Sequence, residues 1–197
     1  HLSYKSAYDL CQVGNSIYVS TDRALFEYNR IDNSVERLNT LNRLSDTGVS
    51  AIEGAEGTLI VAYENGNVDL IFGNRTINLP DIKRASLIAD KRVNHINIDN
   101  NIAYLSCGFG IVVVDIVRQE VKNTYFIGEL GAQTNVLSTS MAHNSIYAAT
   151  NKGLYRADIS HPNLADYQAW EKLSAHSQSR VDLIESFNGL LFVNLHG

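Results

Sequence analysis

The sequence has few cysteines and prolines, no long hydrophobic run and no excess of basic residues, and these shortages exclude several classes of protein. Two cysteines in 197 residues are too few for a small secreted domain that disulfides hold together. No apolar run, such as Ile111 to Val114, approaches the ~20 residues that a membrane helix needs. The net charge of −5 disfavours nucleic acid as a partner, because a nucleic-acid surface is usually basic.

The composition instead indicates a folded domain with a core. Hydrophobic residues make up 45% of the chain and charged residues 19%, which excludes a disordered chain. Cys11 and Cys107 each lie in an apolar, strand-like run, so we expect two core residues and no disulfide. The chain begins at His1 rather than at methionine, so we expect the native protein to start further upstream.

A sequence pattern recurs about every forty-three residues. Its anchors, separated by 42, 44, 43 and 45 residues, are Tyr18, Ile60, Tyr104, Tyr147 and Phe192. A period in the low forties is typical of one four-stranded blade of a β-propeller, although some helical repeats have a similar period. Each repeat contains short apolar runs rich in Val, Ile and Tyr, separated by Asn, Asp and Gly, which favours strands over helices.

The turns within each repeat support the division into strands. Asn or Gly lies between most of the first and second strands, as in Asn188-Gly189, because these residues tolerate the positive φ of tight hairpins. Glycine recurs at the second turn of three repeats, at Gly66, Gly110 and Gly153. Ala24 stands there in the first repeat, so we expect a different or strained turn. In the fourth repeat the expected strands are 135–142, 145–150, 153–158 and 168–173.

The sequence therefore predicts an all-β fold, a β-propeller with four-stranded antiparallel blades, of which about 4.5 are present as a truncated or incomplete ring. The expected segments are blade 1 at about 1–45, blade 2 at about 46–88, blade 3 at about 89–131, blade 4 at about 132–176 and the start of blade 5 at about 177–197. A blade buries its faces against its neighbours. We therefore expect more blades in the native protein, or association through the open blade faces.

No motif in the sequence predicts catalysis, a metal or a cofactor. The nucleophile motifs Gly-x-Ser-x-Gly and Ser-x-x-Lys are absent, and no helix N-terminus is expected to activate Cys107. Zinc-ligand spacing is lacking among the histidines, which are His1, His95, His143, His161, His176 and His196. We expect His95 to be a hydrogen-bonded residue of an inner strand. An enzyme such as a lyase or glycosidase stays open, because the separation of two carboxylates is three-dimensional.

One basic cluster stands out in the longest loop. It consists of Lys83, Arg84, Lys91 and Arg92. The cluster is either a solvated connector or the rim of a face that binds anions. Loops 80–91 and 127–134 are expected to join successive blades on one side of the propeller, where they would provide binding contacts.

Two groups of segments resemble known propeller families. Leu44 to Ile52, Ile17 to Thr21 and Ala149 to Leu154 resemble the two-component regulator propeller repeat, with Tyr, Ile or Phe where that repeat favours Trp. A closer resemblance, in register over nearly the whole chain, is to the N-terminal β-propeller of PorZ-type proteins of the type IX (Por) secretion system of Bacteroidetes. The segments that carry it are 65–71, 81–84, 107–115, 153–158 and 162–167.

The second resemblance implies a larger protein, with two propellers and a C-terminal sorting-type domain, in the cell envelope: the periplasm, outer membrane or cell surface. It implies a non-enzymatic part in maturing and anchoring secreted cargo. The implied partners are other secretion-system proteins or lipopolysaccharide. The alternative is a periplasmic, glycan-sensing propeller of a hybrid two-component regulator, which would be followed by a transmembrane helix and a kinase domain.

Overall fold

The computed structural model of the chain describes residues 6–22, 24–174 and 179–196. His1, Arg23, His176 and Gly197, which the sequence analysis included in repeats or histidine counts, lie outside these ranges. The chain forms two compact units, His1–Ser86 and Leu87–Gly197, and each is described by itself. In the described part of the chain, no helix has the length and apolar character needed to cross a membrane.

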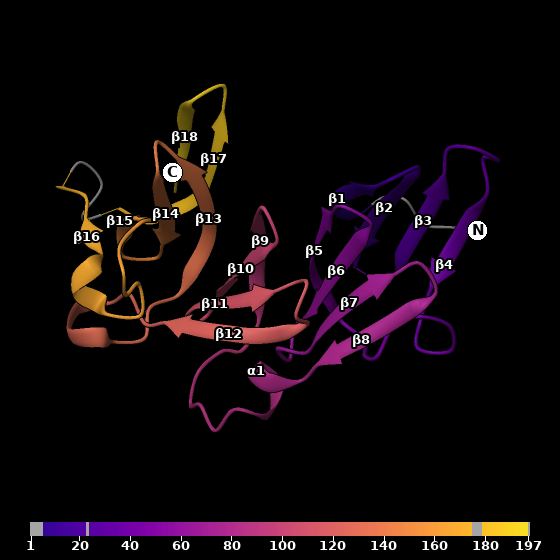
Figure 1. Cartoon of the computed structure of the whole chain (residues 1–197), viewed down its shortest axis with the longest axis horizontal. Coiled ribbons are helices and arrows are strands. Elements are labelled where there is room, and N and C mark those ends of the chain that lie inside the picture. Colours follow the sequence, from indigo (N-terminus) through magenta and orange to yellow (C-terminus); the bar gives the residue numbers. More distant parts are fainter. Residues whose placement is uncertain (1–5, 23, 175–178, 197) are drawn as a thin grey trace. The chain divides into compact units, whose positions relative to one another are not determined.

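The first unit contains two antiparallel sheets whose strands follow one another in chain order (Figure 1). The first sheet consists of β1 (Ala7–Val13), β2 (Ser16–Thr21), β3 (Leu25–Asn29) and β4 (Val35–Leu38). The second consists of β5 (Val49–Ala55), β6 (Thr58–Tyr63), β7 (Val68–Phe72) and β8 (Arg75–Leu79), and a short helix follows, α1 (Asp81–Arg84).

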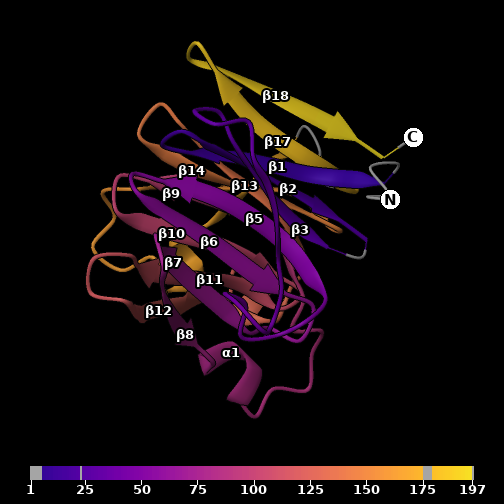
Figure 2. The same cartoon turned by 90° about the vertical axis from the view of Figure 1, so that its right-hand side faces the viewer.

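The second unit repeats this arrangement (Figure 2). One sheet contains β9 (Val93–Asp99), β10 (Ile102–Cys107), β11 (Gly110–Asp115) and β12 (Glu120–Tyr125). The next contains β13 (Val136–Ala142), β14 (Ser145–Thr150), β15 (Gly153–Asp158) and β16 (Glu171–Lys172). A two-stranded sheet follows, with β17 (Val181–Phe187) and β18 (Leu190–Leu195). Four four-stranded sheets and half of a fifth confirm the predicted fold class.

Hydrophobic side chains fill the space between neighbouring sheets within each unit. In the first unit, Leu25 and Leu38 of one sheet pack in the same cluster as Leu59 and Tyr63 of the next. In the second unit, one cluster joins the sheet of β9 to β12 to that of β13 to β16, and a smaller one joins the latter to β17 and β18. A single sheet has no closed interior, so each one is stabilised by burying its faces against the next.

Polar side chains on the first strands of neighbouring sheets add hydrogen bonds between repeats. The backbone N–H of Ile52 donates to the Asp9 carboxylate at 2.9 Å. The Asn94 amide donates to the carbonyl of Val136 at 2.7 Å, and the N–H of Ile184 donates to Ser138 Oγ at 2.9 Å. Each bond spans about one repeat in the sequence, so these residues hold successive first strands in register.

The turn at Ala24 differs from the glycine turns, as expected. Ala24 has no positive φ, and its N–H donates to the Thr21 hydroxyl at 3.1 Å. The Thr21 N–H donates in turn to the carbonyl of Ala24 at 2.9 Å. The threonine side chain thus closes the turn that glycine closes in the other repeats, where Gly66 has a φ of 82°.

The prediction for the fourth strand of the fourth repeat is largely wrong. The sequence analysis expected a strand over 168–173, but the chain forms a 3₁₀ turn, η2 (Tyr167–Ala169), and only Glu171–Lys172 pairs with β15. The Asp166 side chain accepts a hydrogen bond from the N–H of Gln168 and so favours a turn at this point.

Both cysteines are free and buried, as predicted. Burial raises the pKa of the Cys11 thiol to about 12, and it also raises the pKa of Cys107. Because the thiolate is the reactive form, we expect neither thiol to react with Ellman's reagent in the native protein at pH 8. Two thiols should react after unfolding in guanidinium. Release of two equivalents before unfolding would contradict the buried placement of both residues.

Candidate functional site

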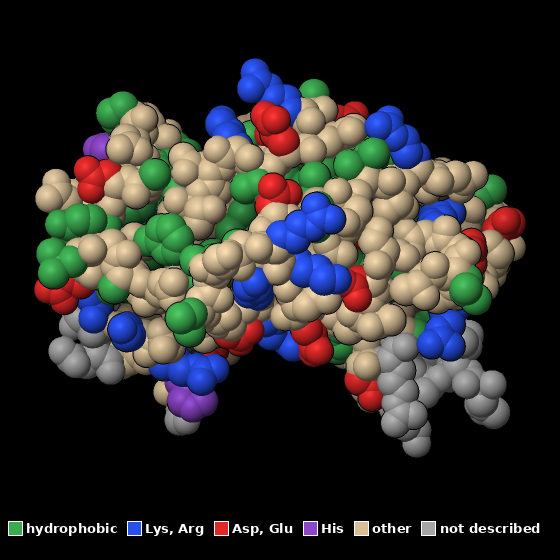
Figure 3. All heavy atoms as spheres, turned by 90° about the horizontal axis from the view of Figure 1, so that it is seen from below, with side chains coloured by type: hydrophobic (Ala, Val, Ile, Leu, Met, Phe, Trp, Pro, Cys, Tyr) green, Lys and Arg blue, Asp and Glu red, His purple; other side chains and the backbone are tan. Residues whose placement is uncertain are grey.

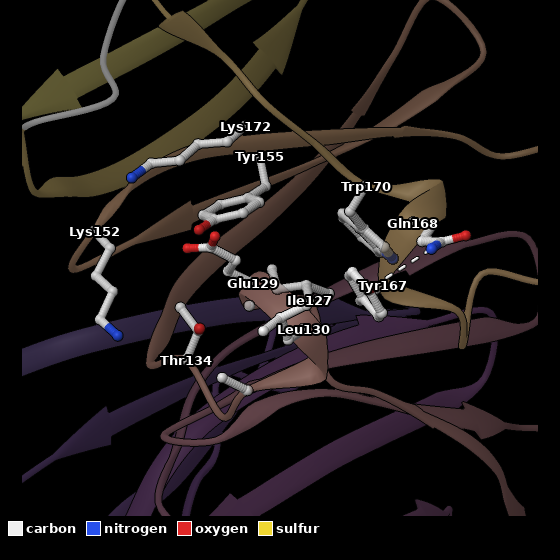
Figure 4. A pocket seen from close by; sticks show the side chains of 12 residues that line it. Ile127, Glu129, Leu130, Thr134, Lys152, Tyr155, Tyr167, Gln168, Trp170 and Lys172 are labelled. Carbon is white, nitrogen blue, oxygen red and sulfur yellow. Dashed lines mark hydrogen bonds between the residues drawn. The ribbon is translucent and has the colours of Figure 1, made fainter.

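A pocket of about 520 Å³ in the second unit is the candidate functional site, and we call it the aromatic pocket (Figure 4). Two short segments face each other across it. One is the connection between β12 and β13, which contains the 3₁₀ turn η1 (Glu129–Gly131), and the other contains η2. The first wall belongs to loop 127–134, one of the two loops that the sequence analysis expected to provide contacts.

Hydrogen bonds and ring contacts fix the floor of the aromatic pocket. Trp170 is buried beside the Tyr125 ring, with 6.2 Å between the ring centroids. Its indole N–H donates to the carbonyl of Leu164 at 2.9 Å. Tyr155 lies at another part of the wall, with Lys172 Nζ 6.0 Å from the centre of its ring. Burial, together with the charge of Glu129, raises the pKa of the Tyr155 hydroxyl, which therefore stays protonated at neutral pH.

The first wall contains two unusual features. Thr134 is buried, and its hydroxyl oxygen has no hydrogen-bond partner within the described chain. Leu130 adopts a φ of 55° and is 80% exposed, although a leucine pays a steric cost in this left-handed conformation. Buried hydroxyls are usually hydrogen-bonded, and strained backbone conformations are uncommon and cluster at functional sites.

The predicted basic cluster does not lie within one unit. Lys83 and Arg84 end α1 in the first unit, whereas Lys91 and Arg92 belong to the second. Lys83 Nζ donates to Asp46 Oδ2 at 2.6 Å. Burial alone would raise the pKa of Asp46, but the hydrogen bonds from Lys83, Asn65 and the Thr47 N–H hold it at about 2. A binding face formed by all four basic residues therefore stays a prediction.

Basic and acidic side chains are mixed on the face drawn in Figure 3, where blue and red residues lie close to one another. The described residues contain no group of three or more His, Cys, Asp or Glu side chains placed to hold a metal ion.

His95 differs from its prediction. We expected a fully hydrogen-bonded residue, but its Nδ1 atom is buried without a partner in the described chain. Its Nε2 atom lies 3.6 Å from the Glu185 carboxylate, which is too long for a hydrogen bond. Burial lowers the pKa of His95 to about 4 and raises that of Glu185, so the imidazole is neutral near pH 7. No sequence pattern predicts this arrangement, because His95 and Glu185 lie on separate strands, β9 and β17.

Successive four-stranded antiparallel sheets that pack face to face through apolar side chains define a β-propeller segment. The family model of the N-terminal β-propeller domain of PorZ, from the type IX secretion system, matches residues 17–171. The chain belongs to this family.

Solved structures show the same fold. PorZ of Porphyromonas gingivalis, described as an essential bacterial surface component of the type IX secretion system, superposes with a TM-score of 0.84 at 23% identity. The superposition covers 98% of this chain and 26% of that one. The extracellular domain of a putative one-component system of B. thetaiotaomicron gives 0.75 at 12% identity, with coverages of 96% and 26%.

The chain thus spans about a quarter of the length of both bacterial structures. The computationally designed Ika8 protein is also similar, with a TM-score of 0.65 at 12% identity, over 96% of this chain and 55% of that one. No curated protein matches the chain. Identities of 12–23% establish a shared fold and do not establish a shared activity.

Proposed function

We propose that this chain is a non-enzymatic interaction scaffold of a type IX secretion system, located in the cell envelope, where it helps to mature and anchor secreted cargo. Membership of the PorZ propeller family is the observation that carries the proposal. The P. gingivalis relative is described as a bacterial surface component, which supports the same location for this chain. Other secretion-system proteins and lipopolysaccharide are the proposed partners.

The basic residues of α1 provide a direct test of the binding face. The double substitution Lys83→Glu and Arg84→Glu in the complete gene is expected to weaken binding to the bacterium's own lipopolysaccharide or partner by about fivefold, because two attractive charges become repulsive. It should also impair the maturation and anchoring of secreted cargo. Binding is measured by sedimentation with lipopolysaccharide or by pull-down with the partner, and processing by the mass of the cargo.

Two further variants separate binding from folding. Lys83 also pairs with Asp46, so Arg84→Glu alone changes the charge of the face without breaking that ion pair. The pair Arg30→Glu and Lys122→Glu, at exposed positions outside the cluster, makes the same change in net charge and should leave binding intact. If the Lys83 and Arg84 variant binds its partners normally and cargo matures as it does with the unmodified protein, the proposed face is wrong.

A glycan-sensing propeller of a hybrid two-component regulator is the second candidate. The similarity to the extracellular domain of a one-component system favours it. The coding sequence downstream of Gly197 distinguishes the two: a transmembrane helix and a signalling domain would support the sensor, and a sorting-type C-terminal domain would support the scaffold.

A further inference from the structure

We propose that the aromatic pocket binds a peptide through one apolar side chain that has a carboxylate next to it. The pocket has two chemically different ends (Figure 4). Apolar and aromatic groups, among them Ile127, Tyr167 and Trp170, form one end. Lys152 and Lys172 lie at the other end. A volume of about 520 Å³ is within the range of pockets that enclose small ligands.

The Thr134 hydroxyl adds an unsatisfied polar group to the wall of the pocket. Thr134 is 2% exposed, it lines the pocket, and its oxygen has no partner among the described residues. A buried hydroxyl without a partner costs about 1–3 kcal/mol, which a hydrogen bond to a ligand would offset. A peptide group of a ligand would satisfy it, because a hydroxyl both donates and accepts hydrogen bonds.

The rim of the pocket points to an apolar anchor. Leu130 keeps a large apolar side chain at the rim although its φ of 55° favours glycine or asparagine. Its 80% exposure means that packing within the chain does not repay this cost. Contact with an apolar group of a ligand would bury that side chain, which is favourable by about 25 cal/mol per Å² of apolar surface.

Two of the three rings of the pocket are poorly placed for a sugar, and the third, Tyr167, is half-buried. Stacking of a sugar needs a flat, exposed aromatic face, but Trp170 is 7% exposed and lies against Tyr125. Tyr155 is 6% exposed and has Lys172 over its ring. These rings form the walls of a hole, and a hole fits an inserted side chain better than a pyranose laid flat. The geometry therefore favours a peptide over a glycan.

The charges at the other end select an anion. Lys152 and Lys172 contribute two positive charges and Glu129 one negative charge, so the charged end is net positive. The carboxylate that they would attract is either an acidic side chain beside the apolar residue or the C-terminus of a peptide. Both sources present the same chemistry, and two different probes separate them.

The test uses the fluorescence of Trp170, because it is the only tryptophan of the chain and lines the pocket. The 197-residue protein is titrated with Ac-Gly-Gly-Asp-Leu-NH2, which has an acidic side chain, and with Ac-Gly-Gly-Leu-OH, which has a free C-terminus. At least one should produce a saturable change in emission. Ac-Gly-Gly-Asn-Leu-NH2 should bind about threefold more weakly than its Asp counterpart, and Ac-Gly-Gly-Asp-Ala-NH2 about tenfold. For the C-terminal source, the amide Ac-Gly-Gly-Leu-NH2 is the uncharged control.

Thr134→Val tests the pocket without damaging the fold. The valine has nearly the same shape and removes a hydroxyl that has no partner, so thermal stability should be unchanged or higher. Peptide affinity should nevertheless fall about fivefold. Ser50→Ala is the matched control, since Ser50 Oγ is also buried and without a partner but belongs to the first unit, and it should not change the affinity. Lys152→Gln with Lys172→Gln should abolish the preference for the charged peptide.

Three results would overturn the inference: no saturable change with either carboxylate peptide, equal affinity for the Leu and Ala peptides, or saturable binding of maltotriose in preference to both peptides. The inference rests on the proposed function only in treating the propeller as a binding scaffold. Peptide binding combined with normal cargo processing in the Lys83 and Arg84 variant would reject the proposed face and keep the pocket. Loss of cargo processing in that variant, together with no peptide binding by the unmodified protein, would keep the proposed face and reject the pocket.

Discussion

Replacing Asp69 with alanine is expected to destabilise the first unit by about 3–5 kcal/mol, because it leaves several buried donors without an acceptor. Asp69 is fully buried on β7. Its Oδ2 atom accepts from the Tyr63 hydroxyl at 2.6 Å and from the Ser45 N–H at 2.8 Å, and its Oδ1 atom accepts from the Asn78 amide at 2.9 Å. Burial, and then the charge of Asp69, raises the pKa of the Tyr63 hydroxyl, so it remains a donor at neutral pH.

Hydrogen–deuterium exchange measures the effect in this unit specifically. A loss of 3 kcal/mol corresponds to about hundredfold faster exchange of the amides that exchange only when the unit opens, such as those of β6. Asp69→Asn keeps one acceptor oxygen, the amide carbonyl, but it places the amide N–H groups against another donor. It should therefore give an intermediate loss of stability. Asp32→Ala removes an exposed carboxylate from a hairpin turn and should have a much smaller effect. Equal exchange in the Asp69→Ala and Asp32→Ala variants would show that the buried network contributes little.

The Asp69 network brings together segments that carry the two family resemblances. Asp69 holds the backbone at Ser45, and the neighbouring Asp46 accepts from Asn65 and Lys83. One segment of the two-component regulator resemblance (44–52) and two of the PorZ-type resemblance (65–71 and 81–84) therefore meet at one place in the first unit. Their chemistry there is structural, so the motif identifies the fold and the family more directly than it identifies a ligand.

Most of the fold could be predicted because the turns and strands of each repeat depend on residues that are close in the sequence. Hairpin turns depend on one or two residues, such as Asn188-Gly189, where both residues adopt a positive φ. The buried anchors Tyr18, Ile60 and Tyr104 recur because every blade buries the same face. Phe192 is 55% exposed, since no described sheet covers the other face of β17 and β18. The period thus predicts which residues face a neighbouring blade, and it cannot tell whether that neighbour is present.

The aromatic pocket was only half predicted, because its second wall interrupts the repeat. Loop 127–134 was expected to provide contacts from its place between blades. The opposite wall lies where the sequence analysis expected a regular strand. The signal available there was Asp166 before Tyr167, since an aspartate that caps the next N–H groups favours a turn. The unsatisfied oxygen of Thr134 could not be predicted from the sequence, because hydrogen-bond partners depend on packing.

Replacing Gly54 with alanine is expected to separate the two sheets of the first unit and cost about 3 kcal/mol. Gly54 lies on β5 beside β1, where a Cβ atom would sit 2.3 Å from the carbonyl oxygen of Gln12 and 3.1 Å from Val13 Cγ2. The first of these is a backbone atom, so relief requires movement of β1 itself. That movement would also stretch the hydrogen bond from the Ile52 N–H to Asp9.

Gly14→Ala separates this steric effect from the loss of glycine flexibility. Gly14 has a φ of 56° and open space around its Cβ position, so alanine there costs only backbone strain of about 1–2 kcal/mol. We therefore expect urea unfolding, followed by exchange of the β5 and β6 amides, to show a larger loss for Gly54→Ala than for Gly14→Ala. The reverse order would mean that β1 and β5 do not approach as closely as the structure shows. The packing of successive first strands, on which the repeat depends, would then be looser in the first unit.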